Sequence, residues 1–366
     1  MREITPRLTP ELDRHRAGAA IWKASAYPVT GFRALVEHVA RLAYVNPDDL
    51  LFFRGQDKDF QSRAGGTTLY PAIYRGDSVA ARELRHRFEL LDQAARLLVE
   101  RFRVAKVDGH RELRIKKYIQ WSILQHYEVV PTPLLDITQS LRVACSFAQL
   151  RSTDPKCYVY VLGLPYLTNR ISINSEHDLV NVRLLSISPP LALRPYFQEG
   201  YLAGTADVTT DFDSKTELDF RNRLIAKFAI PRAKSFWGDG FDPIPEGALY
   251  PDSDQIRVMC SELQGELRTE MQPGRLGEFI SEWAALEDRL LDAARRQTER
   301  NVSVRAAITA LAKRGALQAD HAAALDHLRR FRNEVVHKPS RVLPGELEEW
   351  QTVLRDTVRA LKKGPV

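Results

Sequence analysis

The segment from Gln125 to Ala148, QHYEVVPTPLLDITQSLRVACSFA, constrains the fold of this chain more than any other. Pro131 and Pro133 fix the backbone φ and favour extended conformations in the residues before them, so the chain enters the next element extended. Two leucines and a short polar stretch follow, and then apolar residues at helical spacing. The segment therefore predicts a short strand that leads directly into a helix.

Polar side chains gather at this predicted strand–helix junction. Asp136 and Thr138 are two residues apart, so on a strand they share one face. Ser140 is placed to cap the helix that follows. Backbone N–H groups at the start of a helix can hold an anion, so the junction is a candidate binding site.

A companion motif stands upstream. Residues 51–56, Leu-Phe-Phe-Arg-Gly-Gln, predict a short buried strand that ends in Arg54 and Gly55, and residues 69–75, Leu-Tyr-Pro-Ala-Ile-Tyr-Arg, follow it. The guanidinium of Arg54 offers a two-pronged donor for a phosphate. Asp136 and Thr138 could orient a ribose or a neighbouring arginine.

These motifs resemble the FRG domain family, which is named for its Phe-Arg-Gly motif. The order continues through Gln-His-Tyr at residues 125–127, Leu-Leu-Asp-x-Thr at 134–138 and Val-Ala-x-x-Phe-Ala at 143–148. Arg194 and Gln198, before Gly200, resemble a later family element. The resemblance covers residues 30 to 265, and Glu128 stands where the family usually has glycine, which indicates an altered turn.

We expect the polar residues of these motifs to line one pocket, in which Tyr70 could stack on a planar ring. The seven candidate ligand-binding residues are Arg54, Tyr70, Gln125, His126, Asp136, Thr138 and Gln198. Two structural alternatives stand beside this hypothesis. Arg54 and Asp136 could form a buried ion pair that only joins two segments, and His126 could be a satisfied core histidine.

The same motifs are similar to ADP-ribosyltransferases that begin with an aromatic-Arg-Gly motif. This similarity implies that Arg54 holds NAD or another nucleotide, and that Asp136-Ile137-Thr138 takes the place of a Ser-x-Ser strand. The family also needs a late glutamate, and its place could be filled by Gln198-Glu199, Glu246 or Asp252.

The C-terminal quarter of the chain predicts four helices with short connections. Their expected ranges are 278–297, 303–314, 321–337 and 347–361, with Ser303 as an N-cap and Gly315 after the second helix. Four such helices in sequence describe a small bundle.

The third of these helices ends in a second polar constellation. Asn333 and His337 are four residues apart and lie one above the other, and the long side chain of Arg332 can reach the same side. This Arg-Asn-x-x-x-His pattern resembles the HEPN family, of which many members are metal-independent endoribonucleases that pair two copies of this helix. The resemblance covers residues 275 to 363 and implies Arg332, Asn333 and His337 as catalytic residues, RNA as substrate and a homodimer.

The composition of the chain argues against disulfide-rich, zinc-binding, secreted and membrane-spanning proteins. The three cysteines are too few and too scattered for a disulfide framework or a zinc site, so we expect no metal. The charged first sixteen residues lack the apolar run of a signal peptide, and no apolar stretch is long enough to span a membrane. We therefore expect a cytoplasmic protein without a membrane partner.

Together these observations predict an α+β protein with a mixed sheet, followed by an all-α four-helix bundle. The expected parts are an N-terminal arm at 1–29, an FRG domain at 30–270 and a HEPN-like bundle at 275–363. Three functions stay open. The chain could be a toxin or anti-phage effector that binds a nucleotide and cleaves RNA, or an enzyme that transfers ADP-ribose and dimerises through the bundle. It could also be a non-enzymatic regulator that binds a nucleotide, an antitoxin or another partner.

Overall fold

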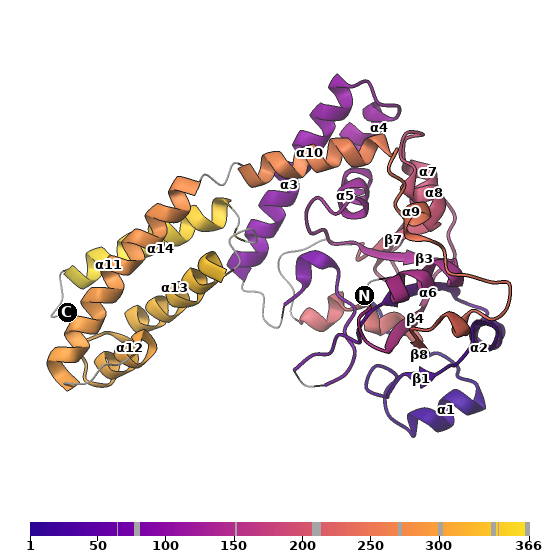
Figure 1. Ribbon diagram of the computed structural model, residues 1–366, viewed down its shortest axis with the longest axis horizontal. Coiled ribbons are helices and arrows are strands. Elements are labelled where there is room, and N and C mark those ends of the chain that lie inside the picture. The colour runs from indigo at the N-terminus through magenta and orange to yellow at the C-terminus, as the bar shows by residue number, and fades with distance from the viewer. Residues whose placement is uncertain are drawn as a thin grey trace. The chain divides into compact units, whose positions relative to one another are not determined.

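The computed structural model of the chain (Figure 1) describes residues 1–63, 65–76, 81–150, 152–206, 214–269, 273–298, 303–337, 342 and 344–362. Within these ranges, the side chains of residues 81, 82, 86, 268, 269, 273–275, 296–298, 337, 344, 345 and 362 are left aside. The chain divides into two compact units, Met1–Gln264 and Gly265–Val366.

The first unit is built on a mixed sheet of eight strands in the order β1-β8-β4-β2-β3-β7-β6-β5, as far as the described residues show. All neighbouring strands are antiparallel except β1 and β8, which are parallel. The strands are β1 (Tyr27–Pro28), β2 (Leu50–Gln56), β3 (Leu135–Thr138), β4 (Lys156–Leu164), β5 (Ile171–Asn174), β6 (Leu179–Arg183), β7 (Gly200–Gly204) and β8 (Leu224–Pro231). The predicted α+β class with a mixed sheet is confirmed.

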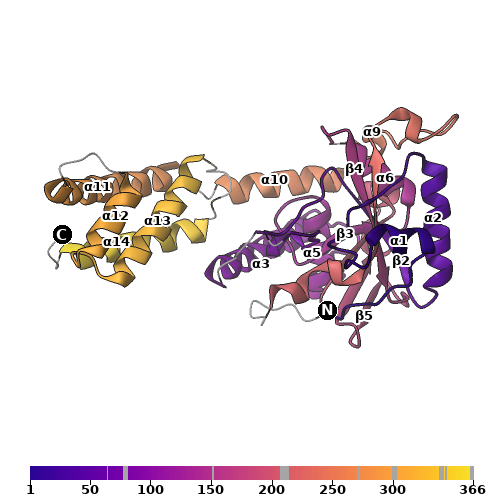
Figure 2. The same ribbon diagram turned by 90° about the horizontal axis from the view of Figure 1, so that it is seen from below.

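Adjacent residues of the central strand β2 serve two different cores, because side chains alternate across a strand. Phe53 packs with Leu42 of α2 (Phe32–Val45) and Ala148 of α6 (Leu141–Leu150). Phe52 packs on the opposite face, with Leu69 and Tyr201. In Figure 2 the sheet stands between α2 on one side and α3 and α5 on the other.

The other helical segments of the first unit are mostly short. The α-helices are α1 (Pro10–Arg16), α3 (Ala81–Val104), α4 (His110–Ile115), α5 (Lys117–His126), α7 (Leu184–Ile187), α8 (Arg194–Gln198) and α9 (Glu246–Leu249). The 3₁₀ helices are η1 (Ala72–Tyr74), η2 (Lys215–Leu218), η3 (Phe220–Arg223) and η4 (Lys234–Phe236). The helix α10 (Gln255–Thr269) runs across the boundary between the units.

Some local features of this unit are not evident from sequence patterns. The helical stretch from α4 to α5 is interrupted at Lys116, whose backbone is extended. The strand β7 begins and ends with glycine, which in a sequence is typical of turns. The segment at 1–29, which the sequence predicts to be an arm, contributes the strand β1 to the sheet and Leu12 and Val29 to the core.

The second unit contains four helices among its described residues beyond the end of α10. They are α11 (Pro273–Thr298), α12 (Val304–Lys313), α13 (Ala319–His337) and α14 (Pro344–Lys362). Trp283 and Leu290 of α11 pack with Leu328 of α13 and Leu354 of α14 in one core. Ser303 caps α12, as the sequence predicts, because its hydroxyl accepts from Ala306 N. Among all described helices, none combines the length and the apolar character that crossing a bilayer requires.

Candidate functional site

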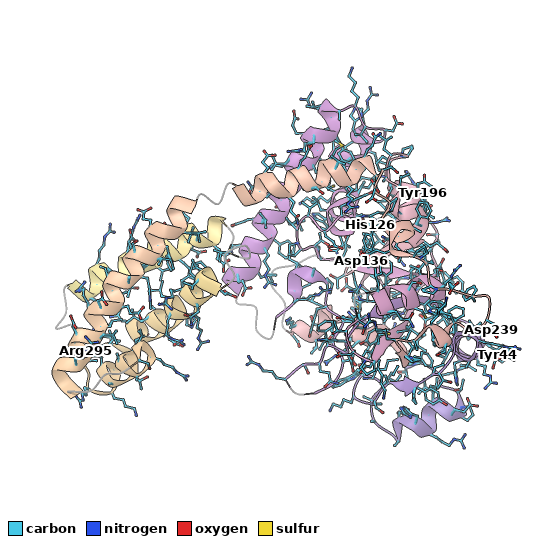
Figure 3. All side chains as sticks on the ribbon, in the orientation of Figure 1. Tyr44, His126, Asp136, Tyr196, Asp239 and Arg295 are labelled. Atoms are coloured by element: carbon cyan, nitrogen blue, oxygen red, sulfur yellow. The ribbon has the colours of Figure 1, made fainter. Side chains whose placement is uncertain are left out.

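A cavity of about 770 Å³ opens in the first unit where β2 and β3 part. The two strands are paired only at Phe53 and Thr138, so their side chains and the loops beyond this point are free to form a pocket. All seven candidate ligand-binding residues from the sequence line this one cavity. His126 and Asp136 can be located in Figure 3, where α5 approaches β3.

The packing around Gly55 explains why the residue after Arg54 is a glycine. A Cβ atom at Gly55 would lie 1.8 Å from the main-chain oxygen of Ala144 in α6. Only glycine therefore lets α6 pack directly on β2. This contact fixes the strand end from which Arg54 extends.

Arg54 forms part of the cavity wall and bridges to β3. Its Nη1 donates to the main-chain oxygen of Asp136 at 2.7 Å, whereas its Nε is buried and has no partner in the described ranges of the chain. Burial, followed by the neighbouring Arg75, lowers the pKa of Arg54 to about 10, so the guanidinium remains charged at neutral pH. The cavity thus holds a fixed cation with unused donor capacity.

The carboxylate of Asp136 is held by a chain of side-chain hydrogen bonds. Gln125 Nε2 donates to Asp136 Oδ2 at 2.7 Å, and Thr132 Oγ1 donates to Gln125 Oε1 at 2.7 Å. Burial raises the pKa of Asp136, and Arg54 and Gln125 oppose this shift. The alternative of a direct Arg54–Asp136 ion pair does not describe this geometry, since Arg54 binds the main-chain oxygen instead.

His126 ends α5 and is buried beside Gly200. Its Nε2 has no hydrogen-bond partner among the described residues, which differs from the alternative of a core histidine whose hydrogen bonds are all made. Burial and, secondarily, the charge of Arg194 lower the pKa of His126 to about 3. The imidazole is therefore neutral at physiological pH and can act as a hydrogen-bonding group in the cavity.

This low pKa makes the first unit sensitive to acid. The unfolded chain binds a proton at His126 below the ordinary histidine pKa, whereas the folded chain does not until far lower pH. Above about pH 6.5, His126 therefore does not reduce the free energy of unfolding. As the pH falls below this value, the free energy of unfolding decreases, with a slope that approaches about 1.4 kcal/mol per pH unit. Urea unfolding between pH 7.5 and 4.5 should show this slope.

The matched variant for this prediction is His126→Phe, which keeps an aromatic ring against Tyr127. Its stability should fall less steeply over the same pH range. The raised carboxyl pKa of Asp136 acts in the opposite direction and is present in both proteins, so it cancels in the comparison. Equal slopes would show that His126 titrates normally in the folded state.

Thr138 and Gln198 join β3 to the turn before β7. Thr138 Oγ1 lies 3.2 Å from the main-chain oxygen of Gln198 and 3.0 Å from that of Glu199, and it accepts from Ser140 N. Gln198 Nε2 donates to the Leu249 oxygen at 2.8 Å. These partners hold the cavity walls together and leave the two side chains less free for a ligand.

The expected late acidic residue does not stand on this cavity. Glu199, Glu246 and Asp252 are exposed, and none of the three is among the described residues that line it. The described carboxylates that do line it are Asp57, Glu128 and Asp136. Glu128 has a left-handed backbone with φ of 56°, which is the conformation that favours glycine and which explains the family's usual residue there.

Several lining residues were not predicted from the sequence. Phe60 is 52% exposed on the loop after β2, and Lys215 places Nζ 4.4 Å from the ring centroid of Tyr70. Burial, and then the carboxylate of Asp219, raise the pKa of Tyr70 to about 12. Arg63 and Arg75 lie close to the Phe-Arg-Gly motif and could have been found as further cations, whereas nothing in the sequence relates Lys215 to Tyr70.

Comparison with known proteins identifies the class of this part of the chain. The FRG domain family model matches residues 50–157, which include six of the seven candidate ligand-binding residues, all but Gln198. No curated protein and no solved structure shows significant similarity to the chain. The first unit therefore contains an FRG domain.

The candidate catalytic residues of the second unit lie at the end of α13, outside that match. Arg332 Nη2 is 3.4 Å from Glu287 Oε2 of α11, and its Nη1 donates to Asn333 Oδ1 at 3.1 Å. Trp283 Nε1 donates to the same Glu287 oxygen at 2.6 Å. The side chain of His337 lies outside the described residues, so its relation to Arg332 stays a prediction.

Proposed function

We propose that the FRG-containing unit binds a nucleotide in the cavity between β2 and β3. The observation that carries this proposal is the charged Arg54 guanidinium, which lines the cavity and keeps donors that no described protein atom uses. A guanidinium is suited to phosphate oxygens. The cavity volume of about 770 Å³ lies in the usual range for sites of small organic ligands.

Charge and aromatic content support the same ligand class. Among the described residues, four cationic side chains line the cavity, from Arg54, Arg63, Arg75 and Lys215, and three carboxylates do so. This excess favours an anion. Phe60 and Tyr70 offer ring faces on which a base can stack.

Binding should depend strongly on Arg54. In calorimetric titrations with ATP, GTP, CTP, UTP, NAD and ADP-ribose, we expect at least one to bind. Arg54→Gln should weaken the binding of that compound about 30-fold, which is the effect of losing roughly 2 kcal/mol of charge-assisted hydrogen bonding. Arg54→Lys should lose about tenfold, since an ammonium keeps the charge without the fork.

The matched control is Arg33→Gln, which removes an equally charged but 95% exposed side chain from α2. It should bind like the wild-type protein. No binding of any of the six compounds, or equal binding by Arg54→Gln, would refute the proposal.

We infer a second activity for the C-terminal helices, which is metal-independent RNA cleavage at Arg332, Asn333 and His337. It is supported by the position of the motif at the end of the third of four helices and by the contact between Arg332 and Glu287 of the first. Cleavage of total RNA should leave 2′,3′-cyclic phosphate ends. The chain would then be a toxin or anti-phage effector in which one unit senses a nucleotide and a dimer of the other cuts RNA.

Transfer of ADP-ribose is the competing activity of the same cavity. The bond from Arg54 to the strand that carries Asp136 and Thr138 favours it, whereas the exposed positions of Glu199, Glu246 and Asp252 speak against it. Incubation of labelled NAD with the protein and cell extract distinguishes ADP-ribose transfer from nucleotide sensing. Label on protein or nucleic acid would favour transfer, and its absence together with NAD or ATP binding would favour sensing.

A further inference from the structure

Three side chains of the cavity have buried polar atoms that make no hydrogen bond within the described part of the chain. Arg54 Nε, Gln56 Oε1 and His126 Nε2 are each buried, and none of them has a hydrogen-bond partner among the residues that the structure describes. All three residues line the cavity, and His126 is 7% exposed. A buried polar atom without a partner destabilises the folded chain, so packing alone does not account for this cluster.

The three groups differ in what they require. Arg54 Nε can only donate, so it needs an acceptor, and a charged oxygen is the strongest one. The neutral imidazole of His126 offers either a donor or an acceptor, depending on its tautomer. The amide of Gln56 likewise offers either, depending on its orientation.

One kind of ligand group can form hydrogen bonds with both neutral side chains, those of His126 and Gln56. A hydroxyl donates one hydrogen bond and accepts others, so it can pair with His126 or Gln56 in any tautomer or orientation. A bare phosphate at neutral pH mostly accepts, and an apolar ring does neither. The cluster therefore favours a ligand that carries hydroxyls as well as an anionic oxygen.

We propose that the cavity recognises a phosphorylated ribose, with an anionic oxygen at Arg54 and ribose hydroxyls at Gln56 and His126. This inference rests on the proposed nucleotide binding and adds that the ribose is the part of the nucleotide that the cavity recognises. Gln56 and Arg54 are two apart on β2 and therefore project from the same face of the strand. His126 reaches the cavity from the end of α5.

The test compares ribonucleotides with their 2′,3′-dideoxy forms in the same titrations, with inorganic tripolyphosphate as a third probe. The wild-type protein should bind the ribonucleotide at least about tenfold more tightly than the dideoxy form, because a removed hydroxyl leaves buried groups unpaired. Gln56→Leu and His126→Phe should each reduce this preference. Gln318→Leu, which changes an exposed glutamine of the second unit, should keep it.

Stability measurements separate recognition from folding. Both variants remove an unsatisfied buried group, so their melting temperatures should equal or exceed that of the wild-type protein. A clear fall for both would assign the residues to the fold and overturn the inference.

The outcomes also separate this inference from nucleotide binding itself. Equal affinity for ribo and dideoxy forms, with binding still dependent on Arg54, would overturn the ribose inference and leave nucleotide binding intact. Tripolyphosphate that binds as tightly as any nucleotide would do the same. Failure of every probe would overturn both.

Discussion

Replacing Gly55 by alanine is expected to destabilise the first unit by about 3 kcal/mol or more, the upper end of the effect of overpacking. The new Cβ would lie 1.8 Å from the Ala144 oxygen, 2.8 Å from the Ala144 carbonyl carbon and 2.9 Å from Ala148 N. All three are main-chain atoms of α6, so no side chain can rotate away. Relief requires α6 to move off β2.

Urea unfolding of the full chain measures this effect, and Gly247→Ala is its control. A Cβ at Gly247 in α9 would have no heavy atom within 4 Å, so that substitution should be neutral or stabilise by up to about 1 kcal/mol. Nucleotide binding should also fall in Gly55→Ala, because the strand end that carries Arg54 is displaced with α6. A Gly55→Ala protein as stable as wild type would contradict the packing described for β2 and α6.

Loss of RNA cleavage in His337→Ala is the second large effect. A histidine that moves protons during attack of a 2′-hydroxyl contributes about 10²–10⁴-fold, so the variant should lose activity on that scale. Arg332→Gln should lose cleavage as well, because its cation would stabilise the phosphodiester. The rate of formation of 2′,3′-cyclic phosphate ends is the measurement.

Controls for this prediction come from the same helix. His327 and Arg330 are exposed on α13, and His327→Ala and Arg330→Gln should cleave RNA at the wild-type rate. An unchanged rate in His337→Ala would remove the ribonuclease proposal. Arg332 is engaged by Glu287 in the free protein, so RNA would have to displace that carboxylate, and Glu287→Gln should lower the KM.

The candidate cavity was largely visible in the sequence because its motifs are local. The Phe-Arg-Gly strand and the Asp-x-Thr strand before a helix each have a recognisable pattern, and the fold places both at the point where β2 and β3 part. Other parts of the wall carry no such pattern. Lys215 is 145 residues from Tyr70 in the sequence, yet they are in contact.

Sequence patterns do not show every element, for physical reasons. The strand β7, Gly-Tyr-Leu-Ala-Gly, is bounded by glycines that read as turn residues, and it forms because β3 and β6 pair with it on both sides. The Arg54–Asp136 ion pair was a reasonable alternative by charge alone. The divergence of the strands instead exposes a main-chain oxygen that Arg54 binds.

The amino-acid sequence alone determined the α+β architecture, the helical C-terminal part and the residue types of the cavity, because periodicity, turn residues and ordered motifs are properties of neighbouring residues. Which of the described polar atoms lack partners depends on the folded arrangement of the chain. Hydrogen bonding at Arg54, Gln56 and His126 depends on chain segments that meet only when the sheet forms. The most specific statement about the ligand therefore comes from the folded chain.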